Sequence, residues 1–234
     1  MTPNIVCEVD DLVPIRRVLV SVWDKAGLEV LIPGLVEVSP EVCFYSTGGT
    51  YRAIAQILGK EQAARRLVPV SDYTGQPETQ GGLVKTLDFK IYLGLLTERY
   101  NPAHQADLAR TGALPLDMVV VNLYPFEAVV SRGTATLEEA RAHIDIGGPS
   151  LLRAAAKNFL RVATLCDPAD YGRVLSFLRE NRGRLGLARR FELARKAFAL
   201  TARYDAAISA FLAGQDPAAV PGVYPLCHQE ERWT

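Results

Sequence analysis

The chain has 234 residues, of which 49% are hydrophobic, and this is enough for one large domain with a well-filled core. Its 26 lysines and arginines balance 26 aspartates and glutamates, so the charge does not favour nucleic acid as a partner. No apolar run approaches the roughly 18 residues of a membrane span, and the N-terminus lacks the basic start and apolar core of a signal peptide. We therefore expect a cytoplasmic protein that does not bind membranes.

The cysteines and histidines do not form a recognisable metal or redox site. The cysteines are far apart and include no C-x-x-C pair, and the three histidines have neither metal-ligand nor triad spacing. Free thiols are expected at four positions: Cys7, Cys43, Cys166 and Cys227. The pattern predicts chemistry without a metal and without catalytic histidine.

The first part of the chain reads as two strands, each followed by a helix. Arg17–Val22 is apolar and rich in β-branched residues, as in a buried strand, and the helix after it is expected to end at Pro33-Gly34. The second strand, 41–45, leads into the turn Ser46-Thr47-Gly48-Gly49-Thr50 and a helix over about 51–58. Hydroxyls and bare amides at a helix N-terminus bind phosphate oxygens, although a plain tight turn has the same pattern.

Two further strands and a lysine follow. Leu67–Val70 is expected at a sheet edge because it contains a proline. Lys85, after a Gly-Gly turn, is either a ligand contact or a lysine on the surface. The continuous apolar run that starts at Met118 predicts a central parallel strand, with Asn122 and Tyr124 at the carboxyl end where ligands bind in open α/β sheets. A core aromatic is the alternative for Tyr124.

The last third is mainly helical. Thr136 and Glu139 have capping-box spacing before a short helix over 137–141. A fifth strand (161–166), a helix (168–181) and a long amphipathic helix (187–212) follow. The long helix has a basic cluster that we interpret as a solvated face, made of Arg189, Arg190, Arg195 and Lys196.

The segment Ile144–Asn158 carries the densest chemistry. Asp145 precedes the turn Gly147-Gly148-Pro149-Ser150, and a helix runs on to Lys157. Together they could supply a base, an anion hole and a cation, although a Gly-Pro turn capping a core helix is the alternative. An unbroken helix would separate Asp145 from Lys157 by roughly 18 Å, so one site holding both requires a short helix or a chain that turns back.

Six segments together resemble a known family: SVWDKAGL (21–28), STGGT (46–50), KTL (85–87), VNLYPF (121–126), IDIGGPSLLRAAAKN (144–158) and KAFALTARYDAAI (196–208). They are similar to the IMP cyclohydrolase domain of the bifunctional purine-biosynthesis enzyme that also carries aminoimidazole carboxamide ribotide transformylase. The resemblance implies a methylglyoxal-synthase-like α/β fold, a parallel sheet with helices on both faces, over residues 16–213. Residues 1–15 would then be an N-terminal extension and 214–234 a loosely ordered tail.

The resemblance also implies an activity. The family closes the ring of 5-formamidoimidazole-4-carboxamide ribotide to IMP, with loss of water, in the last step of de novo purine biosynthesis. It is classed as a hydrolase acting on cyclic amidines, uses no cofactor, and forms dimers. Because the chain ends at Thr234, we expect a free-standing cyclohydrolase without transformylase activity.

The family's site residues carry over individually. The positions for chemistry fall on Lys85, Tyr124, Asp145 and Lys157. We expect Asp145 to be the base, Lys157 the proton donor and acceptor, and the other two to support the oxyanion and the leaving hydroxyl. The substrate-binding positions fall on Ser21, Trp23, Lys25, Thr47, Gly48, Gly49, Thr50, Thr86, Asn122, Ile146, Gly147 and Gly148.

Four residues depart from the family pattern. Trp23 replaces the second serine of SVSDK, while Leu83, Asp88 and Phe89 replace the arginine, histidine and proline of GRVKTLHP. These changes predict altered substrate affinity and loop shape. Two other classes stay open, a methylglyoxal-synthase-type lyase and a non-catalytic domain that binds a phosphorylated metabolite, although a pure sensor would not need the four chemical residues.

Overall fold

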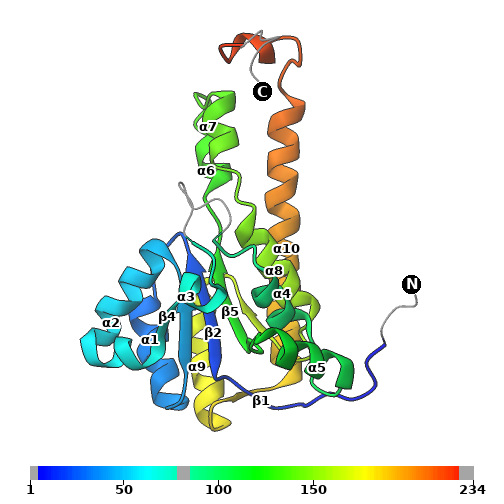
Figure 1. Ribbon diagram of the computed structural model, residues 1–234. Coiled ribbons are helices and arrows are strands. Elements are labelled where there is room, and N and C mark those ends of the chain that lie inside the picture. The colour runs from blue at the N-terminus through cyan, green and yellow to red at the C-terminus, as the bar shows by residue number, and fades with distance from the viewer. Residues whose placement is uncertain (1–4, 78–84, 227–234) are drawn as a thin grey trace. The chain divides into compact units, whose positions relative to one another are not determined.

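The computed structural model describes residues 5–77 and 85–226 (Figure 1). Contacts divide the chain into two compact units, and each is described by itself. The first contains residues 1–123 and 146–201, and the second contains residues 124–145 and 202–234. Within the described residues no helix is both long enough and apolar enough to cross a membrane.

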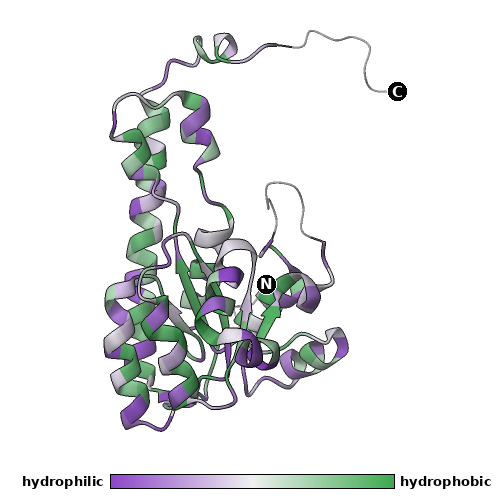
Figure 2. Cartoon of the chain, turned by 90° about the vertical axis from the view of Figure 1, so that its left-hand side faces the viewer, coloured by the Kyte–Doolittle hydropathy of each residue, from purple (hydrophilic) through white to green (hydrophobic). Residues whose placement is uncertain are grey.

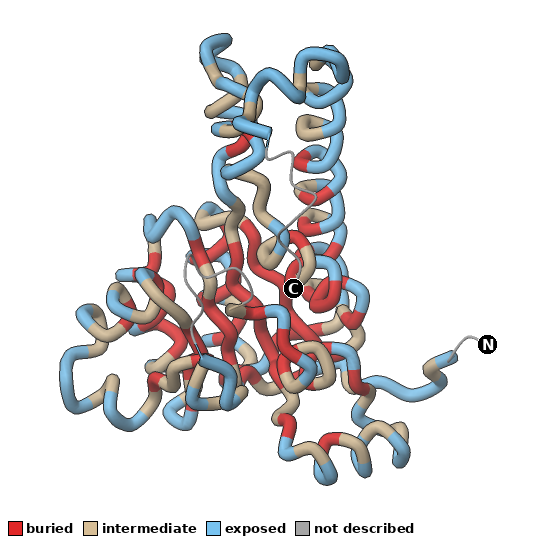
Figure 3. The backbone as a smooth tube through the Cα atoms, turned by 45° about the horizontal axis from the view of Figure 1, so that its top comes forward, coloured by how far each residue is buried: buried red, intermediate tan, exposed pale blue. Residues whose placement is uncertain are grey.

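The first unit is built on a five-stranded parallel sheet with the order β4-β3-β2-β5-β6. The strands are β2 (Arg17–Val22), β3 (Cys43–Ser46), β4 (Leu67–Pro69), β5 (Met118–Asn122) and β6 (Ala163–Leu165). All five were predicted, and β4 lies at an edge, where a proline costs no ladder hydrogen bond. The strands form the buried centre of the unit (Figure 3) and are largely hydrophobic (Figure 2).

Helices cover both faces of this sheet. Alternate residues of a strand point to opposite faces, so Val18 and Val20 of β2 join one core cluster and Leu19 joins the other. The first cluster is closed by α1 (Leu28–Val38), α2 (Gly48–Arg66) and α9 (Tyr171–Glu180). The second is closed mainly by α4 (Phe89–Leu96) and α8 (Gly147–Lys157). The predicted fold class is confirmed.

Shorter elements complete the first unit. These are α3 (Val70–Thr74), α5 (Pro102–Thr111), the 3-10 helix η2 (Pro168–Asp170), and an antiparallel pair of β1 (Val13–Pro14) with β7 (Arg184–Leu185).

The expectation that Pro33-Gly34 ends the first helix is wrong, because α1 continues to Val38. Pro33 lies on the exposed side of α1, where water can bind the carbonyl that loses its intrahelical partner. A Cβ on Gly34 would lie 2.6 Å from a methyl carbon of Leu175, so glycine is needed for the close approach of α1 to α9. Tertiary packing thus keeps both residues inside a helix.

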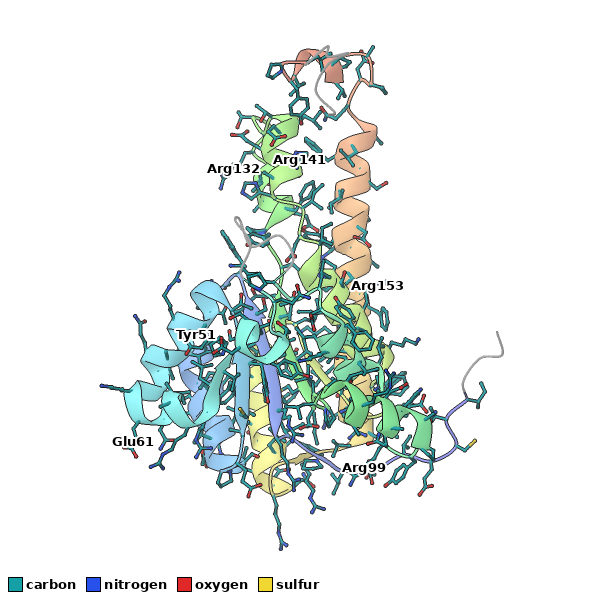
Figure 4. The ribbon with its side chains drawn as sticks, viewed as in Figure 1. Tyr51, Glu61, Arg99, Arg132, Arg141 and Arg153 are labelled. Atoms are coloured by element: carbon teal, nitrogen blue, oxygen red, sulfur yellow. The ribbon has the colours of Figure 1, made fainter. Side chains whose placement is uncertain are left out.

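The helix α2 starts at Gly48, three residues before the predicted start. Its regular part ends at Gly59, whose φ of 71° is non-helical, and a second helical segment then runs to Arg66. The predicted end near Leu58 is therefore correct for the first segment. Tyr51 and Glu61, which lie on either side of this kink, are labelled in Figure 4.

The long helix α10 (Leu187–Ala213) was predicted, but its basic cluster is not a uniform solvated face. Arg190 is fully buried and donates hydrogen bonds to five backbone carbonyls. Its neighbour Arg189 instead pairs with Glu192 at the surface, at 2.7 Å. The interpretation is wrong for Arg190, because four of its five acceptors come from segments distant in the sequence.

The second unit contains α6 (Phe126–Val130), α7 (Leu137–Ala142), the last turns of α10 and the 3-10 helix η3 (Val220–Gly222). Phe126 is buried and packs edge-on against Tyr204 and Phe211 of α10. The predicted capping box at the start of α7 is present in full. The tail contains η3, while Leu83 and Cys227 lie outside the described residues.

Candidate active site

The Gly-Gly turn after β3 is shaped as an anion cradle. Thr47 has extended backbone angles and makes no side-chain capping bond to α2. Gly48 has a φ of 52°, a left-handed conformation that favours glycine, and α2 starts there. The first amides of the helix are therefore available to an anion at its positive end.

Three cations converge on this turn. The Nζ of Lys85 lies 3.1 Å from the position that a Cβ of Gly48 would occupy. For Gly49, the Nζ of Lys25 lies 4.0 Å and the Nη2 of Arg52 lies 3.9 Å from that position. Over residues 5–77 and 85–226, none of the three cations forms an ion pair with a carboxylate. Like charges this close repel, so an anion bound between them would be stabilised.

Arg52 is a residue that sequence reasoning missed. It lies one turn into α2, and side chains on a helix point back toward its N-terminus, so its guanidinium reaches the first turn. The spacing Gly49 to Arg52 is the signal that could have found it, since residues three apart share a helix face.

The loop that carries Lys25 is held by the protein itself. The Oδ1 of Asn122 accepts the backbone N–H groups of Trp23 (2.7 Å) and Asp24 (2.9 Å), and its Nδ2 donates to the Asp24 carbonyl (2.7 Å). Lys25 donates to the Trp23 carbonyl at 2.6 Å and its Nζ lies 5.9 Å from the centroid of the Trp23 ring. Asn122 therefore shapes the loop, and its predicted contact with substrate stays a prediction.

Side-chain hydroxyls also hold the end of strand β2 in place. The hydroxyl of Thr50 accepts the Val22 N–H at 3.2 Å and donates to the Val22 carbonyl at 3.0 Å. Ser46 donates to the carbonyl of Val20 at 2.8 Å. The buried hydroxyls thus hold β2 against the cradle, with Ser21 near the end of that strand.

The Lys85-Thr86 segment links the cradle to the start of α8. While Lys85 lies beside Gly48, the Oγ1 of Thr86 lies 2.9 Å from where a Cβ of Gly147 would be. Any larger residue at position 147 would collide with Thr86, so glycine permits this approach.

Asp88, one of the four departures from the family pattern, has a structural role, because its carboxylate caps α4 by accepting the N–H of Lys90 at 2.8 Å.

Helix α8 separates two residues that the sequence placed in one motif. The helix is unbroken from Gly147 to Lys157, so Gly147 and Lys157 are about 15 Å apart along its axis. Ile146, just before it, is 60% exposed, and Lys157 is exposed in the last turn. The helix is not short, and the chain turns only after Lys157, at residues 158–161, so Lys157 stays at the opposite end of α8 from Gly147.

In the second unit, Tyr124 and Asp145 lie around Tyr204. The Tyr204 hydroxyl accepts the backbone N–H of Asp145 at 2.9 Å. Burial raises the pKa of Tyr204, the hydrogen bond from the Asp145 N–H lowers it, and electrostatic interactions with Asp145, Asp205 and Tyr124 raise it. Two of the four predicted catalytic residues are therefore neighbours of one buried tyrosine, which the sequence analysis had noted only as part of a motif.

No group of histidine, cysteine or acidic side chains among the described residues could hold a metal ion. Of the predicted free thiols, Cys7, Cys43 and Cys166 are free, and burial raises the pKa of the Cys166 thiol to about 11.

This fold and arrangement match known proteins. The family described as "MGS-like domain" matches residues 30–150, and the family described as "AICARFT/IMPCHase bienzyme" matches residues 155–232. The solved structure titled "Crystal structure of ForH" is similar, with a TM-score of 0.67 and 32% identity over 83% of this chain and 97% of that chain. The chain belongs to the MGS-like domain family.

The similar curated relatives narrow the comparison to one kind of protein within that class. "Bifunctional purine biosynthesis protein PurH" of Magnetococcus marinus is 48% identical over 90% of this chain and 38% of its own length. The PurH proteins of Chloroflexus aurantiacus (48% identical, 90% and 38%) and Chlorobium luteolum (46%, 93% and 40%) are similar to it in the same way. The chain thus corresponds to a little over a third of the length of these relatives.

Proposed function

We propose that the chain is an IMP cyclohydrolase that closes the ring of 5-formamidoimidazole-4-carboxamide ribotide. The observation that carries this proposal is the Lys85-Thr86 segment, which touches both the anion cradle at Gly48 and the N-terminus of α8 at Gly147. A nucleotide with its phosphate in the cradle would extend along this segment toward Gly147. The cradle would then bind the phosphate of the substrate, and the residues around Gly147 would face its reacting amide.

The chemistry follows from the residues. The carboxamide nitrogen attacks the formyl carbon of the same molecule, and Asp145 removes a proton from that nitrogen as the C–N bond forms. The formyl oxygen gains negative charge, which the Gly147 and Gly148 amides and the Lys85 ammonium would stabilise. This oxygen takes up two protons, the one that Asp145 removed and the one that the formamide nitrogen gives up as the C=N bond forms, and the C–O bond then breaks to release water. Because both reacting groups are in one molecule, holding them in the plane of the new ring supplies much of the acceleration.

The assignment is tested by ultraviolet absorbance with the formylated ribotide. Ring closure converts an imidazole into a purine and changes the spectrum, so purified chain should produce IMP with multiple turnovers. Binding without a spectral change would contradict the proposal and favour the alternative, a non-catalytic domain for phosphorylated metabolites. Given unformylated ribotide and a formyl-folate, the 234 residues are expected to form no IMP.

The phosphate end of the site yields a prediction. Replacing Arg52 by Gln should raise the KM for the formylated ribotide about tenfold, because one charge-assisted hydrogen bond to the phosphate is lost. Turnover should stay within about twofold, since ground and transition states share the phosphate contact. The control is Arg65→Gln, which removes an exposed arginine of α2 that pairs with Glu61 at 3.0 Å. An unchanged KM in Arg52→Gln would remove Arg52 from the cradle.

We also propose that the working form is a homodimer in which each copy supplies Lys157 to the other's site. Its support is the length of α8, which keeps Lys157 about 15 Å from Gly147, at the start of the same helix. The inactive variants Lys157→Ala and Asp145→Asn, mixed and allowed to exchange subunits, should then recover about a quarter of wild-type activity, because half the dimers have one native site. If the mixture recovered no activity, the shared site would be refuted.

Since the substrate is a charged nucleotide, we propose a cytoplasmic location, which cell fractionation can test.

A further inference from the structure

The loop that carries Asp145 is held at its end by the side chain of Tyr204. After α7, the N–H groups of His143 and Ile144 bind the carbonyls of Ala140 and Arg141, at 3.1 and 3.2 Å, which continues the last helical turn. The N–H of Asp145 binds the Tyr204 hydroxyl instead, at 2.9 Å. The chain therefore leaves the helix at the residue where Tyr204 takes over as the hydrogen-bond partner.

The same hydroxyl also donates to the carbonyl of His143, at 3.1 Å. A tyrosine hydroxyl has one hydrogen to donate and lone pairs to accept, so it can join a donor and an acceptor two residues apart. Because burial raises the pKa of Tyr204 above its ordinary value, the hydroxyl keeps its proton at neutral pH and remains a donor.

Tyr204 is itself firmly placed. The residue is only 5% exposed, and its ring packs edge-on against Phe126 with centroids 6.1 Å apart. The ring therefore supplies a rigid mount on α10, and the hydroxyl transmits its position to the backbone of the loop.

We propose that Tyr204 is a positioning residue for the reaction, one that fixes the backbone of Asp145 so that its carboxylate meets the attacking nitrogen. This inference rests on the proposed function for its consequence in catalysis, but the clamp itself can be measured without it. A base misplaced by about 1 Å can cost as much as two orders of magnitude in rate, so a single hydroxyl at this place has a large effect.

The decisive variant is Tyr204→Phe, which keeps the ring against Phe126 and removes only the hydroxyl. Turnover should fall about tenfold or more, while the KM stays within about twofold. The matched control is Tyr224→Phe in the same unit, whose hydroxyl bonds Glu138 at 2.8 Å and does not touch the Asp145 loop. In an Asp145→Asn background, Tyr204→Phe should have no further effect, because the hydroxyl acts through the base. If Tyr204→Phe lowered the turnover of Asp145→Asn by the same factor as it lowers that of the wild type, the assignment would be overturned.

Amide hydrogen exchange by NMR tests the clamp separately. In the wild-type chain the Asp145 amide should be protected, and in Tyr204→Phe it should exchange at least about tenfold faster, with Tyr224→Phe unchanged. An Asp145 amide that exchanges in the wild type as fast as an open peptide would overturn the proposal, whatever the variant does. If the wild-type chain does not cyclise the substrate, the proposed function fails, while the exchange rates still decide whether Tyr204 holds the loop.

Discussion

Replacing Asp145 by Asn is expected to lower the turnover of ring closure by roughly 100-fold or more, because the amide cannot accept the proton of the attacking nitrogen. Asparagine has nearly the same shape. The bond from its backbone N–H to the Tyr204 hydroxyl does not depend on the side chain, so the loop should keep its conformation. Binding of IMP, measured by calorimetry, should therefore persist while the absorbance assay reports the loss.

The control for this variant is Asp205→Asn. Asp205 is an exposed carboxylate next to Tyr204 in α10, and its charge also raises the pKa of Tyr204. If the loss in Asp145→Asn arose only from the changed charge around Tyr204, Asp205→Asn would show a comparable loss. Near-normal turnover in Asp145→Asn would remove Asp145 from the mechanism.

The largest expected effect on stability is at Arg190. Its guanidinium donates to the carbonyls of Phe159 (3.0 Å), Leu160 (2.9 Å), Leu185, Asp10 (2.8 Å) and Asp11 (2.7 Å). Burial lowers the pKa of Arg190 to about 10, so the group is still charged at neutral pH. One side chain therefore joins the N-terminal segment, the turn after α8 and β7 to the long helix.

Arg190→Met should lower the free energy of unfolding by about 3–5 kcal/mol, since methionine fills similar space but leaves these carbonyls without donors. The measurement is urea unfolding followed by circular dichroism. Arg189→Met is the matched control on the same turn, where a partly exposed ion pair with Glu192 contributes about 1 kcal/mol or less. A loss in Arg190→Met no larger than that of Arg189→Met would show that the carbonyl cage contributes little to stability.

Much of the fold could be predicted from local pattern. The continuous apolar runs of β2 and β5 indicate strands covered on both faces, and Pro69 indicates an edge, because these properties depend on a few adjacent residues. The capping box at Thr136 is equally local. The glycine at position 48 was recognised for the same reason, since its φ of 52° favours glycine. The predicted turn over residues 147–150 is wrong, because α8 already begins at Gly147.

The errors arose where long-range contacts decide. Pro33 and Gly34 have a strong local tendency to end a helix, but the packing of Gly34 against Leu175 outweighs that tendency. Arg190 has the composition of a solvated helix face, yet four of its carbonyl acceptors come from two distant segments, Asp10-Asp11 and Phe159-Leu160. No spacing in the sequence encodes such a set of partners.

For the candidate site, the sequence alone predicted which residues have suitable chemistry: the carboxylate of Asp145, the lysines as cations and the two glycine pairs at the starts of helices. Only the tertiary structure decided how they group. It brings Arg52 to the cradle of Lys25 and Lys85, engages Asn122 in shaping the Lys25 loop, and puts the Tyr204 hydroxyl on the backbone of Asp145. The physical reason is that chemical type is a property of one residue, whereas a site is a set of distances, and those depend on how strands and helices far apart in the chain pack together.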